Sequence, residues 1–178
     1  ILGILQGLTE FLPVSSSGHL VLAQAILGVK QSGVSFEVLV HLGSLLAVLV
    51  YFRSRIFRLV KSLFDNGMVA ERKIVLGLIV ATLPAVIAAL LFKDFFEAAF
   101  SNPLMTSIML FVTGIILIST VLVKKRSGVV TIPKALLMGI GQAVAIIPGI
   151  SRSGTTIATG IMAGVEPAVA AEFSFLLS

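Results

Sequence analysis

The chain alternates long apolar runs with short segments of polar and charged residues. Three predominantly apolar runs, 36–52, 74–92 and 104–123, hold 17, 19 and 20 residues. As helices that rise about 1.5 Å per residue, they would reach roughly 26, 28 and 30 Å, close to the thickness of the hydrocarbon core of a bilayer. The pattern therefore predicts three membrane-spanning helices, the second of them kinked at Pro84.

Two other apolar stretches are interrupted by proline and serine. Residues 1–29 are predicted to form two short helices around a break at 13–18, and residues 134–165 two short helices around a break at 148–154. Each half would cover about half of a membrane. Broken helices are tolerated at membrane depth only where protein or a water-filled cavity covers the freed backbone groups. We therefore expect two re-entrant hairpins inside the protein.

The two broken stretches share a motif, in which a glutamine and eight further residues precede Ser-x-Ser-Gly. One copy runs from Gln6 to Gly18, and the other from Gln142 to Gly154, 136 residues later. Three predicted spans separate the copies, and an odd number of crossings inverts the second copy relative to the first. Inverted repeats whose broken helices meet near the midplane are typical of transporters. We therefore expect residues 13–19 and 148–156 to touch in space.

The predicted fold class is an all-α polytopic membrane protein with an inverted repeat, two re-entrant hairpins and transmembrane helices, in one domain over 1–178. The first repeat would cover about 1–133, and the second would start at about 134. Because the second repeat is much the shorter, we expect it to be truncated at residue 178 and the intact protein to continue through further spans.

Composition and charge agree with a membrane protein. Hydrophobic residues make up 57% and charged residues 12%, and the mean hydropathy is +1.13. The chain has no cysteine, which excludes disulfides and thiol nucleophiles. It has only two histidines, which excludes a His-rich metal site. A net charge of +5 does not indicate nucleic-acid binding, because the basic residues lie beside apolar spans.

The charge of the connecting segments predicts an orientation. Segments 53–73 and 124–134 each carry a net charge of +4, whereas 93–103 carries −1. The positive-inside rule places the first two in the cytoplasm and the third outside.

The break segments also carry candidate binding residues. Five serines stand where helix N-caps are expected: Ser15, Ser16, Ser17, Ser151 and Ser153. Arg152 lies between the last two of them. Helix N-termini bind phosphate, and arginine is its usual bidentate partner. Two such ends that converge would form an anion site. The alternative is that the serines only cap short helices.

Three ionisable residues, Glu10, His19 and Arg152, are unexpected at membrane depth and therefore indicate function. Glu10 follows Gln6 by four residues, so both project from one helix face. This pair could orient a histidine, position water or hold a hard cation. Alternatively, Glu10 and Arg152 form a structural ion pair. For other polar groups near the breaks we expect packing and hydrogen bonding alone: Thr9, His41, Gln142 and Thr156.

The two break motifs are similar to those of a known family. The fourteen residues from Gln6 to His19 resemble the first signature of the undecaprenyl-diphosphate phosphatase (bacitracin-resistance) family, and the segment from Pro148 through Thr156 resembles the second. The resemblance covers the whole chain. It implies an enzyme of the bacterial cytoplasmic (inner) membrane that hydrolyses undecaprenyl diphosphate to undecaprenyl phosphate and inorganic phosphate, in the recycling of the cell-wall lipid carrier.

The resemblance further implies an active site open to the periplasm, a divalent cation such as Mg²⁺ or Ca²⁺, and no organic cofactor. The partners would be the isoprenyl diphosphate and membrane lipids, without nucleic acid, and a homodimer is among the oligomeric states left open. The family's first motif allows Glu or Gln at its opening position, and here it is Gln6. Gln6 and Glu10 are the candidate cation ligands.

We predict that Ser16 is the nucleophile and His19 the general acid/base, with Glu10 holding His19 or a cation. Phosphate would bind to Arg152 together with five hydroxyl side chains: Ser15, Ser17, Ser151, Ser153 and Thr155. A histidine nucleophile and a metal-activated water are the competing mechanisms. A transporter or flippase of a lipid phosphate is the alternative function, because inverted repeats with broken helices also occur in carriers.

Overall fold

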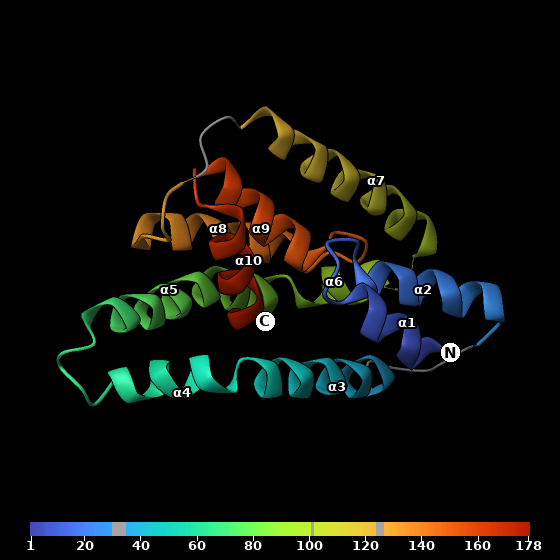
Figure 1. The fold of residues 1–178 in the computed structure, drawn as a ribbon. Coiled ribbons are helices and arrows are strands. Elements are labelled where there is room, and N and C mark those ends of the chain that lie inside the picture. The colour runs from blue at the N-terminus through green and yellow to red at the C-terminus, as the bar shows by residue number, and fades with distance from the viewer. Residues whose placement is uncertain (30–34, 101, 124–126) are drawn as a thin grey trace.

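The structure, a computed structural model, describes residues 1–29, 35–100, 102–123 and 127–178. Within these ranges the regular structure is helical, apart from one isolated bridge between Gly128 and Val165. In chain order the elements are α1 (Leu2–Thr9), α2 (Ser16–Leu27), α3 (Ser35–Tyr51), α4 (Arg53–Ser62), α5 (Val69–Leu91), α6 (Lys93–Phe100), α7 (Pro103–Ser119), the 3₁₀ turn η1 (Thr120–Leu122), α8 (Ile132–Val144), α9 (Arg152–Met162) and α10 (Pro167–Leu176), as Figure 1 shows. The all-α prediction is confirmed.

Among the described residues, two helices are long and apolar enough to cross a membrane, Val69–Leu91 and Pro103–Leu122. They correspond to the second and third predicted spans. Helix α5 continues through Pro84 as one helix of 23 residues. The first predicted span differs, because Val38–Tyr51 and Arg53–Ser62 meet at an angle of 74° and pass the same test only as a bent pair.

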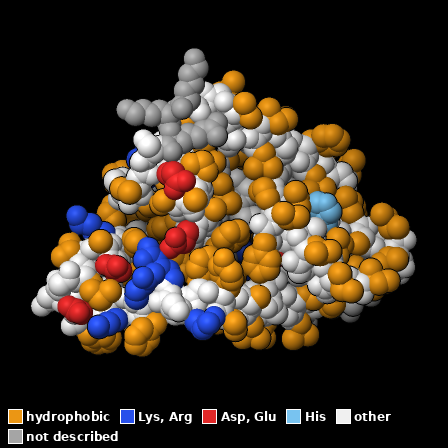
Figure 2. Space-filling view, viewed as in Figure 1, with side chains coloured by type: hydrophobic (Ala, Val, Ile, Leu, Met, Phe, Trp, Pro, Cys, Tyr) orange, Lys and Arg blue, Asp and Glu red, His pale blue; other side chains and the backbone are white. Residues whose placement is uncertain are grey.

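The charged connections are more helical than predicted. Segment 53–73 contains α4 and the start of α5, and segment 93–103 contains α6. Helix α4 mixes basic and apolar residues at helical spacing, so that Leu59 is buried while Arg53, Arg58 and Lys61 are exposed. Figure 2 shows Lys and Arg gathered at the end of the molecule where α4 meets α5, with hydrophobic side chains over much of the remaining face. Residues 124–126, which carry most of the third charged segment, lie outside the described residues.

Both predicted breaks are present. The chain leaves helical structure between α1 and α2, and again between α8 and α9. Helix α1 ends at Thr9 and α8 at Val144, about three residues earlier than predicted. A proline disfavours helical conformation in the residue before it, and Pro13 and Pro148 lie a few residues beyond these ends.

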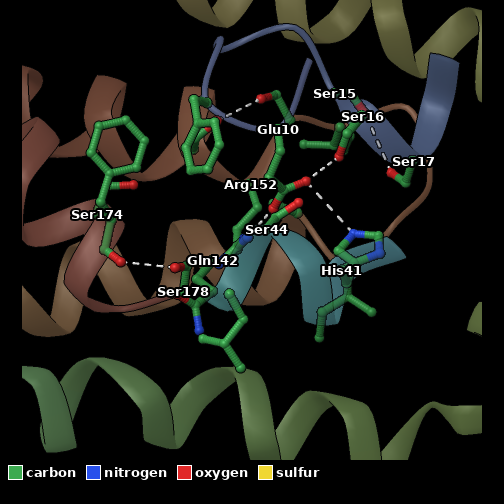
Figure 3. Close-up of a pocket in the computed structure, with 18 of the residues that line it drawn as sticks. Glu10, Ser15, Ser16, Ser17, His41, Ser44, Gln142, Arg152, Ser174 and Ser178 are labelled. Carbon is green, nitrogen blue, oxygen red and sulfur yellow. Dashed lines mark hydrogen bonds and ion pairs between the residues drawn. The ribbon is translucent and has the colours of Figure 1, made fainter. Parts of the chain in front are cut away.

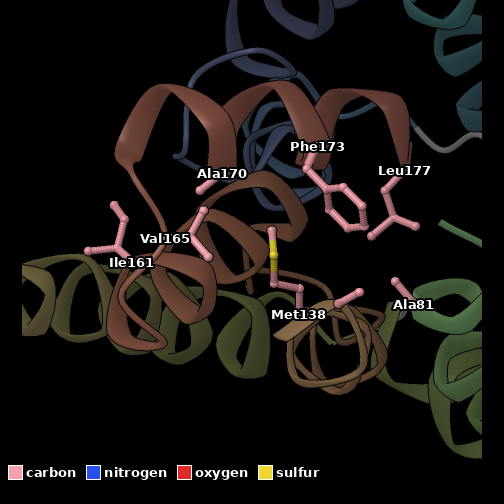
Figure 4. Packing of buried hydrophobic residues seen from close by; sticks show 8 residues of the cluster. Ala81, Met138, Ile161, Val165, Ala170, Phe173 and Leu177 are labelled. Atoms are coloured by element: carbon pink, nitrogen blue, oxygen red, sulfur yellow. The ribbon is translucent and has the colours of Figure 1, made fainter. Parts of the chain in front are cut away.

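A compact apolar cluster joins α5, α8, α9 and α10 (Figure 4). Its buried members are Ala81, Ala135, Met138, Ile161, Val165, Ala170, Phe173 and Leu177. Gly139 lets α8 approach α5 closely, since a Cβ at this position would lie 2.7 Å from the Cα of Ala81. Small residues permit such contacts between membrane helices. Helix α10 has no counterpart among the predicted helices. It contributes Ala170 and Phe173 to this cluster, and Leu177 follows directly after its end.

Candidate active site

The two breaks end in equivalent helix caps. Ser15 Oγ accepts a hydrogen bond from the Gly18 N–H at 3.3 Å at the start of α2, and Ser151 Oγ accepts one from the Gly154 N–H at 3.0 Å at the start of α9. Ser15 adopts φ 67° and ψ 90° and is the one non-glycine residue with positive φ in the described ranges. Strained backbone of this kind persists where the surrounding structure imposes it, often at functional sites.

The two break segments touch each other. Ser153 Oγ donates a hydrogen bond to the Leu12 carbonyl at 3.3 Å, across 141 residues of sequence. Gly18 lies against Gly149, where a Cβ on Gly18 would be 3.0 Å from the Gly149 Cα. The prediction that the breaks meet in space is therefore confirmed, and the N-termini of α2 and α9 start from the same place.

Helix α7 fixes the second break. Thr113 Oγ1 donates to the Gly149 carbonyl at 2.8 Å and accepts from the Ser151 N–H at 3.0 Å. Gly149 has φ 94°, a conformation that L side chains rarely adopt. One buried hydroxyl thus satisfies two backbone groups on either side of the turn, as backbone at membrane depth requires.

Glu10 is the centre of the polar cluster at this junction (Figure 3). Its Oε1 accepts from Arg152 Nη2, and its Oε2 accepts from the hydroxyl of Ser16. Gln6 Nε2 also donates to Oε2, at 2.9 Å, and His41 Nε2 lies 3.6 Å from the same oxygen. The Glu10 side chain is only 9% exposed, so its charge depends on these neighbours.

The cluster forms the polar end of a cavity of about 660 Å³. Ser15, Ser16, Ser17, Ser151, Arg152 and Ser153 line it together with Glu10 and His41. The remaining wall is largely apolar, and it includes Val38, Leu42, Leu45 and Val48 of α3, Ala85 of α5, Phe100 of α6 and Phe175 of α10. The cavity therefore offers hydroxyls, a guanidinium and two helix N-termini at one end and a hydrocarbon surface elsewhere.

The structure brings most of the predicted site residues together. Glu10 contacts both Ser16 and Arg152, and four of the five predicted phosphate-binding hydroxyls line the cavity. Thr155 is the exception, because it is buried within α9 and is not among the lining residues. Gln6 contacts Glu10 as its i, i+4 spacing indicates, but it is 1% exposed and lies behind the cavity wall.

The position of His19 differs from expectation. Its Nδ1 lies 2.8 Å from the Ser15 carbonyl oxygen, and no contact with Glu10 is present among the described residues. The imidazole next to Glu10 belongs to His41, for which we expected packing alone. His19 starts the second turn of α2, so its ring turns back to the Ser15 carbonyl. The expectation that Glu10 holds His19 is therefore replaced by a Glu10–His41 contact, while a catalytic role for His19 stays a prediction.

Two further residues could have been recognised from the sequence. His41 is an imidazole inside an apolar span, which is by itself an indication of function at membrane depth. Gln142 lines the cavity, and its buried Oε1 has no hydrogen-bond partner among the described residues. Both were expected to serve in packing, because sequence spacing does not reveal which face of a helix borders a cavity.

The donors at this site do not suit a resident metal ion. No group of three or more His, Cys, Asp and Glu side chains that could hold a metal occurs in the described part of the chain. Glu10 is the one acidic side chain among the described residues that line the cavity, and its two oxygens already contact Arg152 and Ser16. Mg²⁺ usually keeps several waters and binds through one or two carboxylates together with substrate phosphates. A cation at Glu10 would therefore depend on the substrate for part of its ligand set.

Together, the apolar helices and this cavity define a membrane protein whose cavity has one polar end, lined by hydroxyls, a carboxylate and a guanidinium. Comparison with known proteins agrees, since the family model described as "Bacitracin resistance protein BacA" matches residues 1–178. Similar proteins include undecaprenyl-diphosphatase of Syntrophotalea carbinolica, 48% identical over all of this chain and 70% of that protein. Undecaprenyl-diphosphatase of Methanobrevibacter smithii is 43% identical over all of this chain and 70% of its own length. Undecaprenyl-diphosphatase 2 of Bacillus thuringiensis is 43% identical over 99% of this chain and 68% of its own length.

The chain belongs to the BacA family.

Proposed function

We propose that this protein is a membrane phosphatase that hydrolyses undecaprenyl diphosphate to undecaprenyl phosphate and inorganic phosphate. Membership of the BacA family and the names of the relatives support this activity. The observation that carries the proposal is the contact of Ser16 and Arg152 with the same carboxylate at the polar end of the cavity. A candidate nucleophile (Ser16), a proton acceptor (Glu10) and a phosphate-binding guanidinium (Arg152) thus lie next to one another.

The cavity fits the chemistry of this substrate. A diphosphate bears several negative charges, which the N-termini of α2 and α9, the serine hydroxyls and Arg152 can bind. The isoprenyl chain is a hydrocarbon, and the walls supplied by α3, α5 and α10 are apolar. The substrate would therefore enter with its terminal phosphate toward Ser16 and its chain along α3.

The proposed reaction begins when Ser16 Oγ attacks the terminal phosphorus. An O–P bond forms to serine, and the anhydride P–O bond breaks, with its electron pair leaving on undecaprenyl phosphate. The serine proton passes to Glu10, which already accepts the Ser16 hydrogen bond. Arg152 and the helix N-termini stabilise the charge on the transferring phosphoryl group. Water then attacks the phosphorus of the phosphoserine, and the bond between Ser16 Oγ and phosphorus breaks. Glu10 returns its proton to Ser16 Oγ, and the protons of the water leave with inorganic phosphate.

For the divalent cation, we propose that it arrives bound to the diphosphate and is not held by the protein beforehand. The scarcity of oxygen donors around Glu10 supports this. Metal analysis of purified protein dialysed against Mg²⁺ without lipid should find no stoichiometric binding. Stoichiometric, Glu10-dependent Mg²⁺ in the lipid-free protein would overturn this point.

We also propose that the two broken helix pairs are re-entrant halves of an inverted repeat, with the cavity open to the periplasm of the inner membrane. The matching N-cap serines, Ser15 and Ser151, and the contact between the breaks support the repeat. The basic side chains gathered where α4 meets α5 support a cytoplasmic location for that end. A cysteine replacing Asn66 should resist an impermeant thiol reagent in intact cells and react after lysis. Labelling in intact cells would reverse the orientation.

The activity is tested by phosphate release from undecaprenyl diphosphate in detergent, with no membrane gradient. Ser16→Ala should reduce release to background, whereas Ser107→Ala, on the exposed side of α7, should not change it. A trapped phosphoenzyme that survives mild acid but not alkali would identify serine. Turnover by Ser16→Ala, with an acid-labile phosphoenzyme on His19, would instead establish the histidine nucleophile.

A further inference from the structure

Glu10 is held from several directions. Its four neighbours come from four helices: Gln6 from α1, Ser16 from α2, His41 from α3 and Arg152 from α9. Of these, Ser16 and Arg152 are the groups that the proposed reaction uses directly. The contacts of Gln6 and His41 with Oε2 require another explanation.

The backbone alone does not determine where the Glu10 carboxylate points. Glu10 lies just after the last residue of α1 and opens the irregular turn that leads to Pro13. Contacts between side chains must therefore fix the carboxylate. Because Ser16 donates its hydroxyl hydrogen to Oε2, the direction of the Ser16 hydroxyl depends on where that oxygen is.

Helix α3 supplies two of these contacts from one turn. His41 and Ser44 are three residues apart, so they share a face of the helix. His41 Nε2 lies 3.6 Å from Glu10 Oε2, and Ser44 Oγ accepts a hydrogen bond from Gln6 Nε2 at 3.4 Å. Gln6 Nε2 itself donates to Glu10 at 2.9 Å. One turn of α3 thus holds the carboxylate directly through His41 and indirectly through Gln6.

We propose that His41 is a positioning residue for the phosphatase reaction, which acts by fixing the Glu10 carboxylate so that Ser16 is aimed at the terminal phosphate. The proposal rests on the proposed function. The His41 side chain is 40% exposed and borders the cavity, so substrate can reach it without displacing a packed group. Catalytic hydrogen bonds are often long in structures without substrate and shorten when substrate binds, and the proposal requires the 3.6 Å separation of His41 Nε2 and Glu10 Oε2 to shorten in this way.

The first experiment compares His41→Leu with His41→Gln in purified protein in detergent. Leucine removes the N–H donor, and kcat should fall about 10–100-fold with KM within about twofold, the loss typical of a misplaced catalytic group. Glutamine places an amide N–H near the position of Nε2 and should recover at least about a third of the wild-type kcat, because a positioning role needs the donor and not the imidazole. Leu46→Ala, on the exposed side of the same helix, is the matched control and should keep wild-type kinetics.

A double-mutant cycle tests whether His41 acts through Glu10. Gln6→Leu removes the other support of the same oxygen, so the two losses should be clearly non-additive. Four outcomes would each overturn the proposal. The kcat of His41→Leu could be unchanged, or His41→Gln could be as impaired as His41→Leu. The change could also be confined to KM, or the losses in the double mutant could be strictly additive. Where His41→Leu does not fold, His41→Ala, which also lacks the donor, takes its place with the same expected loss of kcat. If the wild-type protein releases no phosphate, the proposed function is overturned as well. If the wild-type protein is active and the His41 variants have unchanged kinetics, only this inference is overturned.

Discussion

Replacing Arg152 separates its two roles, since its guanidinium both faces the cavity and pairs with Glu10. In Arg152→Ala the Glu10 carboxylate, 9% exposed, would lose its one arginine partner. A buried charge whose partner is removed retains its desolvation cost without compensation. We therefore expect the variant to lose stability as well as activity.

The magnitude follows from the burial of the pair. Breaking a fully buried ion pair by removing one partner costs about 3–5 kcal/mol. Here Arg152 is 33% exposed, and Ser16 and Gln6 still donate to Glu10. These features reduce the expected loss to about 2–3 kcal/mol. For a chain of this length that loss corresponds to a fall in Tm of about 5–10 °C.

Activity should respond differently to the conservative change. Arg152→Lys keeps a positive charge near Glu10, so we expect its Tm to fall by less than about 3 °C. Lysine lacks the planar fork that binds two phosphate oxygens, and phosphate release should still fall about 100-fold, as for loss of a donor to a transition-state oxyanion. The chain has no Trp and one Tyr, so unfolding is best followed by far-UV circular dichroism, alongside phosphate release from undecaprenyl diphosphate.

A cycle with Glu10 completes the test. Glu10→Gln removes the buried charge, so Arg152→Ala should cost much less stability in that background than in the wild type. An Arg152→Ala protein with an unchanged Tm, or stability losses that simply add, would show that the ion pair does not stabilise the fold. Near-normal turnover in Arg152→Lys would refute the bidentate clamp and leave a point-charge role.

Two other substitutions test the surroundings of the site. His19→Ala should lower turnover about 10–100-fold by releasing the Ser15 carbonyl. His19→Asn, whose amide can replace Nδ1, should recover part of the lost turnover, and no recovery at all would favour a histidine nucleophile. Gly139→Ala should destabilise the protein by about 2 kcal/mol because the new methyl group meets the backbone of Ala81, whereas Gly114→Ala, where a Cβ has open space, should not destabilise it in the same melting experiment.

Much of the helical pattern was predictable because it depends on neighbouring residues. Apolar runs of membrane length identify α5 and α7, and proline with clustered serines identifies the two breaks. The caps by Ser15 and Ser151 follow from the same local chemistry. Even the contact between the breaks was predictable, since a repeated motif separated by three spans implies that both copies face one site.

Other features depend on how the helices pack, and the sequence left them open. The 74° bend between α3 and α4 falls at Phe52, where neither proline nor glycine indicates it. Helix α6 lies in a segment that we expected to be a loop, and α10 in a run too short to predict. Both are helices that pack against neighbouring helices, and tertiary contacts stabilise such short helices more than intrinsic propensity does.

The sequence by itself determined which residue types stand at the breaks: a carboxylate, a row of serines, an arginine and a histidine. Only the tertiary structure decided that the imidazole beside Glu10 is His41 and that the ring of His19 turns to the Ser15 carbonyl. The physical reason is that His19 is constrained by the turn of its own helix, whereas His41 reaches Glu10 only because α3 packs against α1. Spacing along a chain defines the faces of a helix, but the packing of separate helices decides which face meets the site.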